Sequence, residues 1–283
     1  MLLRKFTVFL EHFLQKESDK ILLVNGARQI GKSYLIRYVG QKLFPHFVEI
    51  NLKEDSEGER VFADVHSPSD LYMRLGNYYS SPLGDKSDTL IFLDEIQSYP
   101  HLLTMLKFLN QESRYRFIAS GSQLGVALSE TPSVPLGSVT IEQMYPLDFE
   151  EFLWATGVGK EWIENVREHF LREEPLEEST HQILLKRFQY YLLVGGLPEA
   201  VNHYLADRNM VRVRQVHKDI HSLYRIDASQ YDEERKLKIR RIYDLIPSNL
   251  ENKKKRIVYK YIEGKKGKTF SDYVDEFEYL SNS

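Results

Sequence analysis

Residues Ile21 to Ser33 read ILLVNGARQIGKS, and this stretch decides the fold. Its first four residues, Ile21 to Val24, are apolar and predict a buried strand. The segment Gly26 to Ser33 matches the pattern G-x-x-x-x-G-K-S without a mismatch, and the residues that follow it are typical of a helix. A strand, a glycine-bounded loop and a helix in this order predict a binding site for the phosphates of a nucleoside triphosphate.

Each position of this loop has a predicted role toward ATP and Mg²⁺. Gly26 and Gly31 let the backbone approach the phosphates, Lys32 would reach the β- and γ-phosphates, and the Ser33 hydroxyl would ligate Mg²⁺. The residues expected to contact the nucleotide are Gly26, Ala27, Arg28, Gln29, Ile30, Gly31, Lys32, Ser33 and Tyr34. The alternative is an ordinary strand–helix turn with a solvated lysine, which the flanking strand and helix make less favoured.

A second chemical motif lies at Thr89 to Gln97, which reads TLIFLDEIQ. The apolar run Leu90 to Leu93 predicts a strand buried on both faces, with two carboxylates at its carboxyl end. Asp94 would hold Mg²⁺ or one of its waters, and Glu95 would act as the general base on the attacking water. Alternatively, both carboxylates cap a helix that begins at Ile96.

Another buried strand is predicted at Arg116 to Ser122, RFIASGS, and it ends in small hydroxyl residues. Ser120 is the candidate catalytic residue here, contacting the γ-phosphate or the attacking water, and Ser122 is the second choice. A serine-rich turn without a function explains the same residues equally well. Thr140 to Tyr145 is predicted to be the last strand of the sheet.

The order of elements predicts a three-layered α/β fold with a mostly parallel sheet. Strands and helices alternate up to about residue 147, and the pattern from residue 148 to 228 is helical. We therefore expect a P-loop domain over residues 1–147, a helical domain over 148–228 and a further segment over 229–283.

Composition is that of a soluble globular protein, with 42% hydrophobic and 28% charged residues and a formal net charge of −3. The chain has no cysteine, which excludes a disulfide framework and thiol catalysis. Its first 18 residues predict an amphipathic helix and neither a signal peptide nor a membrane span. We expect a cytoplasmic protein with no membrane association.

One strongly basic run covers residues 252–268 and contains seven lysines and one arginine. Tyr259 and Tyr261 alternate with these charges as they would along a strand. The run is either a surface that binds DNA or a protein partner, or a solvated lysine-rich hairpin.

Five short motifs resemble one family when they are taken together: GARQIGKS, LIFLDEIQ, ASGSQL, PLDFEEFL at Pro146 to Leu153 and GGLPEAV at Gly195 to Val201. In this order they are similar to AAA+ superfamily ATPases whose P-loop domain is followed by a domain of unknown function. The resemblance implies an ATP-binding core, a helical lid over 148–228 and a winged-helix-like segment over 229–283. Members of the family usually continue into a nuclease-like domain, so we expect this chain to be a truncated or a naturally short form.

The chain departs from the family at the arginine that usually assists hydrolysis across a subunit interface. No Arg or Lys occurs between Phe117 and Gly159, which includes the expected position. Because such an arginine is worth about 10³- to 10⁵-fold in turnover, we expect slow hydrolysis or an arginine from elsewhere. Arg28 either supplies it or faces a partner. The oligomeric state stays open, and an oligomer is compatible with the sequence.

Two hypotheses from different classes follow. The first is a Mg²⁺-dependent ATPase with slow or regulated turnover, in which Lys32, Glu95 and Ser120 are catalytic and Ser33 and Asp94 hold the metal. The second is a nucleotide-gated module that binds DNA or a protein with little turnover. A small-molecule phosphotransferase is less favoured because no acceptor motif is present, and the absence of N-K-x-D argues against a GTPase.

Overall fold

A computed structural model describes residues 1–16, 18, 20–78, 83–122, 124, 137–227, 236–251, 253 and 255–282. The chain forms two compact units, Met1–Arg214 and Gln215–Ser283, and helix α11 (Met210–Asp227) contains the boundary between them. None of the described helices is long and apolar enough to cross a membrane.

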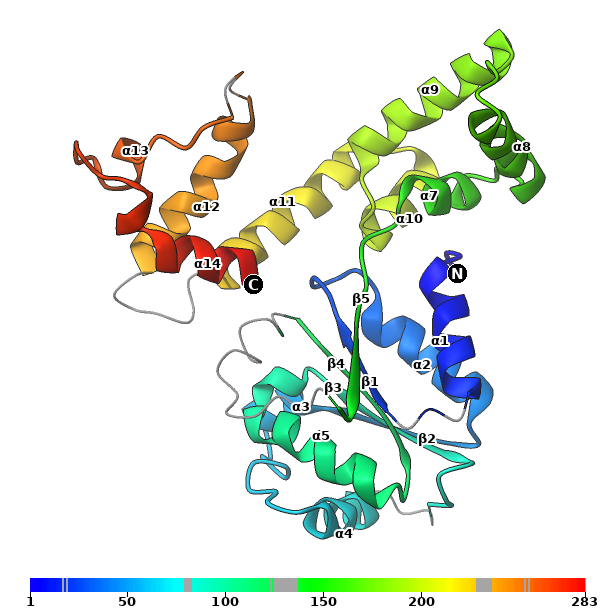
Figure 1. Cartoon of the computed structure of the whole chain (residues 1–283), viewed down its shortest axis with the longest axis vertical. Helices are drawn as coiled ribbons and strands as arrows, with labels where there is room; N and C mark the ends of the chain where they lie inside the picture. The colour runs from blue at the N-terminus through cyan, green and yellow to red at the C-terminus, as the bar shows by residue number, and fades with distance from the viewer. Residues whose placement is uncertain are drawn as a thin grey trace. The chain divides into compact units, whose positions relative to one another are not determined.

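A sheet of five parallel strands forms the centre of the first unit (Figure 1). Its order is β2-β3-β4-β1-β5, so strands that are distant in the sequence are neighbours. The strands are β1 (Ile21–Asn25), β2 (His46–Asn51), β3 (Thr89–Asp94), β4 (Arg116–Gly121) and β5 (Val139–Gln143). The prediction of a parallel α/β sheet is confirmed.

Helices cover both faces of this sheet and make it the middle of three layers (Figure 1). Side chains alternate along β1, so Leu22 and Val24 pack with α1 (Lys5–Gln15) and α2 (Lys32–Leu43). Ile21 and Leu23 belong to the core on the other face. That face is covered by α3 (Leu52–Glu57), α4 (Pro68–Tyr78) and α5 (Pro100–Glu112), and the short helix η1 (Ile96–Ser98) precedes α5.

Four helices follow the last strand within the first unit: α7 (Phe149–Ala155), α8 (Lys160–Leu171), α9 (Glu178–Val194) and α10 (Pro198–Asp207). Along the chain, the alternation of strands and helices gives way to helices alone at Asp148, which is the N-cap of α7. Phe152 of α7 is fully buried and lies against Tyr191 and Tyr204, so the helices share an aromatic core.

The second unit contains α12 (Lys236–Glu251), α13 (Lys260–Glu263), η2 (Phe270–Asp272) and α14 (Val274–Asn282). Its described residues form helices and no strand, so the strand-like alternation expected around Tyr259 and Tyr261 is wrong. The reason is tertiary: Ile262 is fully buried beside Ile242 and Tyr273, and a helical turn brings it there. The winged-helix-like character of 229–283 stays a prediction.

Candidate functional site

Three strands of the sheet end at the same edge as the phosphate loop. Asn25 at the end of β1 is level with Gly121 of β4, and Val24 is level with Ser120. Leu93 of β3 pairs with Ala119, so Asp94 follows at the same height. Because ligands of parallel α/β sheets bind at the carboxyl ends of the strands, the motifs predicted from the sequence converge here.

Glycine is required at Gly26 because of a close backbone approach. A Cβ atom at this position would lie 2.4 Å from the Met144 carbonyl oxygen and 2.8 Å from Ile30 Cδ1. Gly31 has a φ of +95°, in the left-handed region where a side chain is strained. The fully buried Ile30 anchors the loop between these two glycines.

Lys32 lies against its own loop, with 5% of its surface exposed. Its Nζ donates hydrogen bonds to the carbonyl oxygens of Gly26 (2.7 Å) and Ala27 (2.8 Å). Burial lowers the pKa of Lys32, and the nearby carboxylates of Glu95 and Asp94 act in the opposite direction. The ammonium group is therefore a desolvated positive charge at the helix N-terminus, placed to attract phosphate.

Asp94 is buried, and its carboxylate is surrounded by hydroxyl groups. Oδ1 accepts a hydrogen bond from the Ser120 hydroxyl and another from the Glu95 backbone N–H at 3.1 Å. Burial raises the pKa of Asp94, whereas hydrogen bonds from Ser120 and Ser33 oppose this rise. The Ser33 hydroxyl thus lies near the Asp94 carboxylate, although the two residues are distant in the sequence.

These two side chains fit Mg²⁺, which prefers hard oxygen ligands and is commonly held by one or two protein groups together with phosphate oxygens and waters. In the described part of the chain, no group of three or more His, Cys, Asp or Glu residues could hold a metal ion by itself. Phosphate oxygens and waters would have to supply the remaining ligands of an ion held by Ser33 and Asp94.

Glu95 has a left-handed backbone conformation (φ 55°, ψ 47°), which is uncommon for a residue with a side chain. It precedes η1 but makes no side-chain capping bond, so the capping alternative for Glu95 is not supported. Its Oε2 accepts hydrogen bonds from the Gln97 amide and from the Ser122 hydroxyl, the latter at 3.3 Å. Two neutral donors therefore orient the predicted general base.

The two serines of the third motif have different positions. Ser120 is fully buried and bonds Asp94, whereas the Ser122 hydroxyl also lies 3.3 Å from Arg28 Nε and 3.4 Å from the Gln97 amide. Ser122 therefore connects the phosphate loop with the predicted base. Arg28 is half-buried, and it bonds the same Ser122 hydroxyl as Glu95.

A cavity of about 380 Å³ lies beside the phosphate loop, within the first unit. Backbone and side chains of the N-terminal segment, the loop, α2 and α10 line it: Met1, Leu2, Arg4, Ile30, Gly31, Tyr34, Leu35, Pro198 and Asn202. Its volume is within the range of small-molecule sites. Tyr34, predicted from the sequence to contact the nucleotide, thus lines a cavity next to Gly31.

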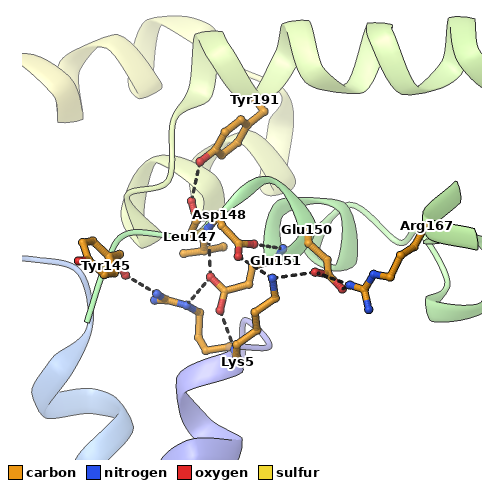
Figure 2. A network of polar contacts seen from close by, with 9 residues as sticks. Lys5, Tyr145, Leu147, Asp148, Glu150, Glu151, Arg167 and Tyr191 are labelled. Atoms are coloured by element: carbon orange, nitrogen blue, oxygen red, sulfur yellow. Dashed lines mark hydrogen bonds and ion pairs between the residues drawn. The ribbon is translucent and has the colours of Figure 1, made fainter. Parts of the chain in front are cut away.

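The predicted helix–helix turn at Gly195–Pro198 packs against the end of the sheet domain. The Leu147 N–H donates to the Gly196 carbonyl at 2.8 Å, and the Tyr191 hydroxyl donates to the Leu147 carbonyl at 2.8 Å (Figure 2). A Cβ atom at Gly196 would lie 2.2 Å from that carbonyl oxygen, which explains the glycine.

Arg4, Gln97 and Glu151 were missed as site residues by the sequence analysis. Arg4 is buried although it occupies a charged position of an amphipathic N-terminal segment, and it pairs with Glu151 at 3.1 Å. The only signal for Glu151 was local, an acidic residue three positions after Asp148, as in a capping box. Gln97 is one of many polar residues that follow a strand, and nothing in its spacing distinguished it.

Two family models match parts of the sequence. A family model described as an AAA domain matches residues 18–153, and a model described as a domain of unknown function (DUF8612) matches residues 185–283. No curated protein matches the chain in sequence.

Solved structures with a similar arrangement include AMPPCP-bound DnaA from Aquifex aeolicus, with 12% identity and a TM-score of 0.40 over 96% of this chain and 86% of that one. The Orc1 protein of Aeropyrum pernix in complex with DNA has 15% identity and a TM-score of 0.40, covering 97% and 82%. The RuvB branch migration motor of Thermotoga maritima has 13% identity and a TM-score of 0.43, covering 99% and 87%.

Proposed function

We propose that this chain, an AAA+ P-loop protein whose residues 18–153 are an AAA domain and whose C-terminal part is a domain of unknown function, binds ATP with Mg²⁺ and hydrolyses it slowly or under regulation. The observation that carries the proposal is that Asp94, which belongs to the second motif, lies near Ser33 and near the buried ammonium group of Lys32 in the phosphate loop. We propose residues 1–147 as the ATPase domain, 148–228 as a helical lid and 229–283 as a separate module.

Each residue has a role in this reaction. Lys32 and the loop N–H groups bind the phosphates, and Ser33 and Asp94 hold the metal, which neutralises charge on the phosphates when it is bound. Glu95 takes the proton of the attacking water, and Gln97 and Ser122 orient its carboxylate. Ser120 donates to Asp94 and orients that carboxylate, and its predicted contact with the γ-phosphate or the attacking water stays part of the proposal.

The cavity beside Gly31 supports a nucleoside ligand. It adjoins the loop that takes the phosphates, and it combines aromatic and apolar side chains (Tyr34, Leu35 and Pro198) with the amide of Asn202. A purine base needs flat apolar contact and a few hydrogen-bonding groups, which this lining supplies. Because Pro198 and Asn202 belong to α10, a base held there would contact the proposed lid, and the nucleotide state would then influence the lid.

Slow or regulated turnover is supported by the charge distribution. The stretch between Phe117 and Gly159 contains no Arg or Lys that a neighbouring subunit could use at the expected position. Arg28 donates a hydrogen bond to the Ser122 hydroxyl of its own chain at 3.3 Å. Such an arrangement favours binding over rapid transition-state stabilisation. We also propose that it acts in the cytoplasm, a location that a chain without cysteine permits.

The test is ATP turnover and ATP affinity of the parent beside Lys32→Ala and Glu95→Gln. Hydrolysis by the parent, together with ATP binding but no turnover by Glu95→Gln, is the expected result. Loss of binding in Lys32→Ala is expected as well, because the phosphates lose their cationic partner. A parent that binds no nucleotide contradicts the proposal.

A second function, a nucleotide-gated binding module, is favoured by the basic C-terminal run. Lys253, Lys255, Arg256, Lys260, Lys265 and Lys266 are all exposed there. Lysines at this density release counterions when they meet DNA phosphates or an acidic protein. The test of this second function is binding to a DNA duplex with and without ATP, at two salt concentrations. The same binding is measured for the double variant Lys255→Gln and Arg256→Gln, which removes two positive charges from the run. A salt-independent or variant-independent signal contradicts DNA binding through this run.

A further inference from the structure

Arg4 is a buried arginine that uses three different nitrogen atoms for three different partners. Its Nε pairs with Glu151 Oε2 at 3.1 Å, one terminal nitrogen donates to the Ile30 carbonyl at 3.1 Å, and the other donates to the Tyr145 carbonyl at 2.5 Å. The residue is 6% exposed. Ile30 belongs to the phosphate loop. Tyr145 follows β5, and Glu151 lies on α7 (Figure 2).

We propose that Arg4 is a positioning residue of the nucleotide site, which holds the Ile30–Gly31 peptide so that the Gly31 N–H points toward the bound phosphates. The inference rests on the proposed ATP binding and concerns how the loop is held in its binding-competent form.

Arg4 can orient the Gly31 N–H through the Ile30 carbonyl because both groups belong to one planar peptide. In a planar trans peptide the C=O and N–H bonds point in opposite directions. Arg4 fixes the direction of the Ile30 carbonyl, and the N–H of Gly31 on the same peptide then points the other way. Gly31 itself does not enforce this orientation, because a glycine at φ +95° has access to several peptide orientations. A contact from outside the loop has to select one, and Arg4 makes that contact.

Glu151 extends this control to the helices that follow the sheet. It is 4% exposed, and besides Arg4 it accepts hydrogen bonds from the backbone N–H groups of Lys5 (2.6 Å) and Asp148 (3.1 Å). Its carboxylate therefore lies at the N-terminus of α7 while it holds the guanidinium group. A displacement of α7 would move Arg4 and with it the Ile30–Gly31 peptide, so the phosphate loop and the first helix of the proposed lid are mechanically connected.

Lysine does not replace arginine at this position. The guanidinium group presents its donors in one rigid plane, toward three acceptors that lie in different directions, whereas a lysine ammonium is a single point charge. Arg4→Lys thus keeps the charge beside Glu151 but releases the Ile30 or the Tyr145 carbonyl. The control is Lys5→Gln, because Lys5 lies next in the sequence and its ion pairs with Asp148 and Glu150 are at the surface.

The experiment measures the affinity of the parent, Arg4→Lys, Glu151→Gln and Lys5→Gln for ATP, ADP, GTP and adenosine, with circular dichroism and thermal unfolding of each. We expect Arg4→Lys to bind ATP and ADP about tenfold more weakly, as for the loss of one well-placed donor to phosphate. Adenosine affinity and the preference for ATP over GTP stay within about twofold of the parent, since the base contacts are unchanged. Lys5→Gln behaves as the parent.

Since Arg4 also lines the cavity, it could instead contact the base. A loss of adenosine affinity equal to the loss of ATP affinity overturns the inference in that way. Folded Arg4→Lys that binds ATP as tightly as the parent overturns it as well. If Arg4→Lys does not fold, Glu151→Gln takes its place, with a smaller loss of phosphate affinity expected and the same two contrary results. A parent that does not bind ATP overturns the proposed function, whereas equal binding by parent and variants overturns this inference alone.

Discussion

The Ser120 hydroxyl donates a hydrogen bond to Asp94 Oδ1, and both side chains are buried at the edge of the sheet where the phosphate loop begins. Parallel pairing of β3 with β4 places them at the same height. Ser120 thus orients the predicted metal ligand, and its neighbour Ser122, two positions later, reaches Glu95 and Arg28. The two serines of one short motif serve the metal side and the base side of the site.

Ser120→Ala is expected to raise the Mg²⁺ concentration needed for half-maximal ATP turnover by about tenfold, because groups that orient a metal ligand contribute on this scale. It also leaves a buried carboxylate with one donor fewer, which costs about 1–3 kcal/mol of unfolding free energy. Turnover titrated with Mg²⁺ and chemical denaturation measure the two effects. Ser122→Ala is the control: it is expected to lower turnover without a shift in the Mg²⁺ requirement. An unchanged Mg²⁺ requirement in Ser120→Ala contradicts the assignment.

Gln97→Ala is expected to lower kcat about tenfold with little change in the KM for ATP, since a mispositioned general base affects the proton transfer and not ground-state binding. The Gln97 amide and the Ser122 hydroxyl are the two donors to Glu95 Oε2, so the double variant with Ser122→Ala should lose less than the sum of the single effects. Steady-state kinetics of Gln97→Ala, Ser122→Ala and the double variant test this expectation. Independent, fully additive losses would show that the two residues do not act on one carboxylate.

Gly26→Ala is expected to abolish ATP binding and to destabilise the protein by about 1–3 kcal/mol, as overpacking of a tight site does. The new Cβ would lie 2.4 Å from a backbone oxygen, which cannot move away as a flexible side chain can. Gly76→Ala is the matched control, because nothing lies within 4 Å of its Cβ position and it belongs to helix α4. It should stabilise the protein by about 0.5–1 kcal/mol. Thermal unfolding and ATP affinity of both variants test the contrast.

Asp94→Asn is expected to stabilise the nucleotide-free protein at neutral pH. The folded-state pKa of Asp94 is raised by burial above the ordinary value of 3.8, so ionising it costs more in the folded than in the unfolded chain. The cost is absent below pH 3.8 and develops as the pH rises through the folded-state pKa. The gain from Asn should therefore be largest near pH 7 and shrink toward about pH 4. Thermal unfolding across this range measures it, and Glu161→Gln, an exposed change, should show no such trend. A stabilisation by Asp94→Asn that increases toward acidic pH would contradict the raised folded-state pKa of Asp94.

Much of the site was predictable because its chemistry is local in the sequence. The loop Gly26 to Ser33 needs a strand before it and a helix after it, and the pair Asp94–Glu95 needs the end of a buried strand. Hydrophobic runs and glycine spacing encode both, and the parallel sheet follows from their alternation with helices. The partners of the two serines could not be predicted in the same way: the structure shows Ser120 bonded to Asp94 and Ser122 bonded to Glu95, and the predicted γ-phosphate contact of Ser120 stays a prediction.

Residues with no local signature could not be identified this way. Arg4 lies 26 residues before Ile30 and 147 before Glu151, and only the packing of α1, the phosphate loop and α7 brings the three together. A charged residue near the N-terminus looks exposed until the partners that neutralise it are known. The same holds for Ile262, whose burial against Tyr273 turns an apparent strand into helix.

The sequence by itself determined the class of fold and the placement of the glycine-bounded loop and of the Asp94–Glu95 pair at strand ends, because these depend on periodicity and on the conformational limits of a few adjacent residues. Tertiary structure alone decided which buried charges pair and which hydroxyl serves which carboxylate. The reason is physical: desolvated charges need partners in the correct direction within about 3 Å, and the folded backbone, not the order of residues, places them there.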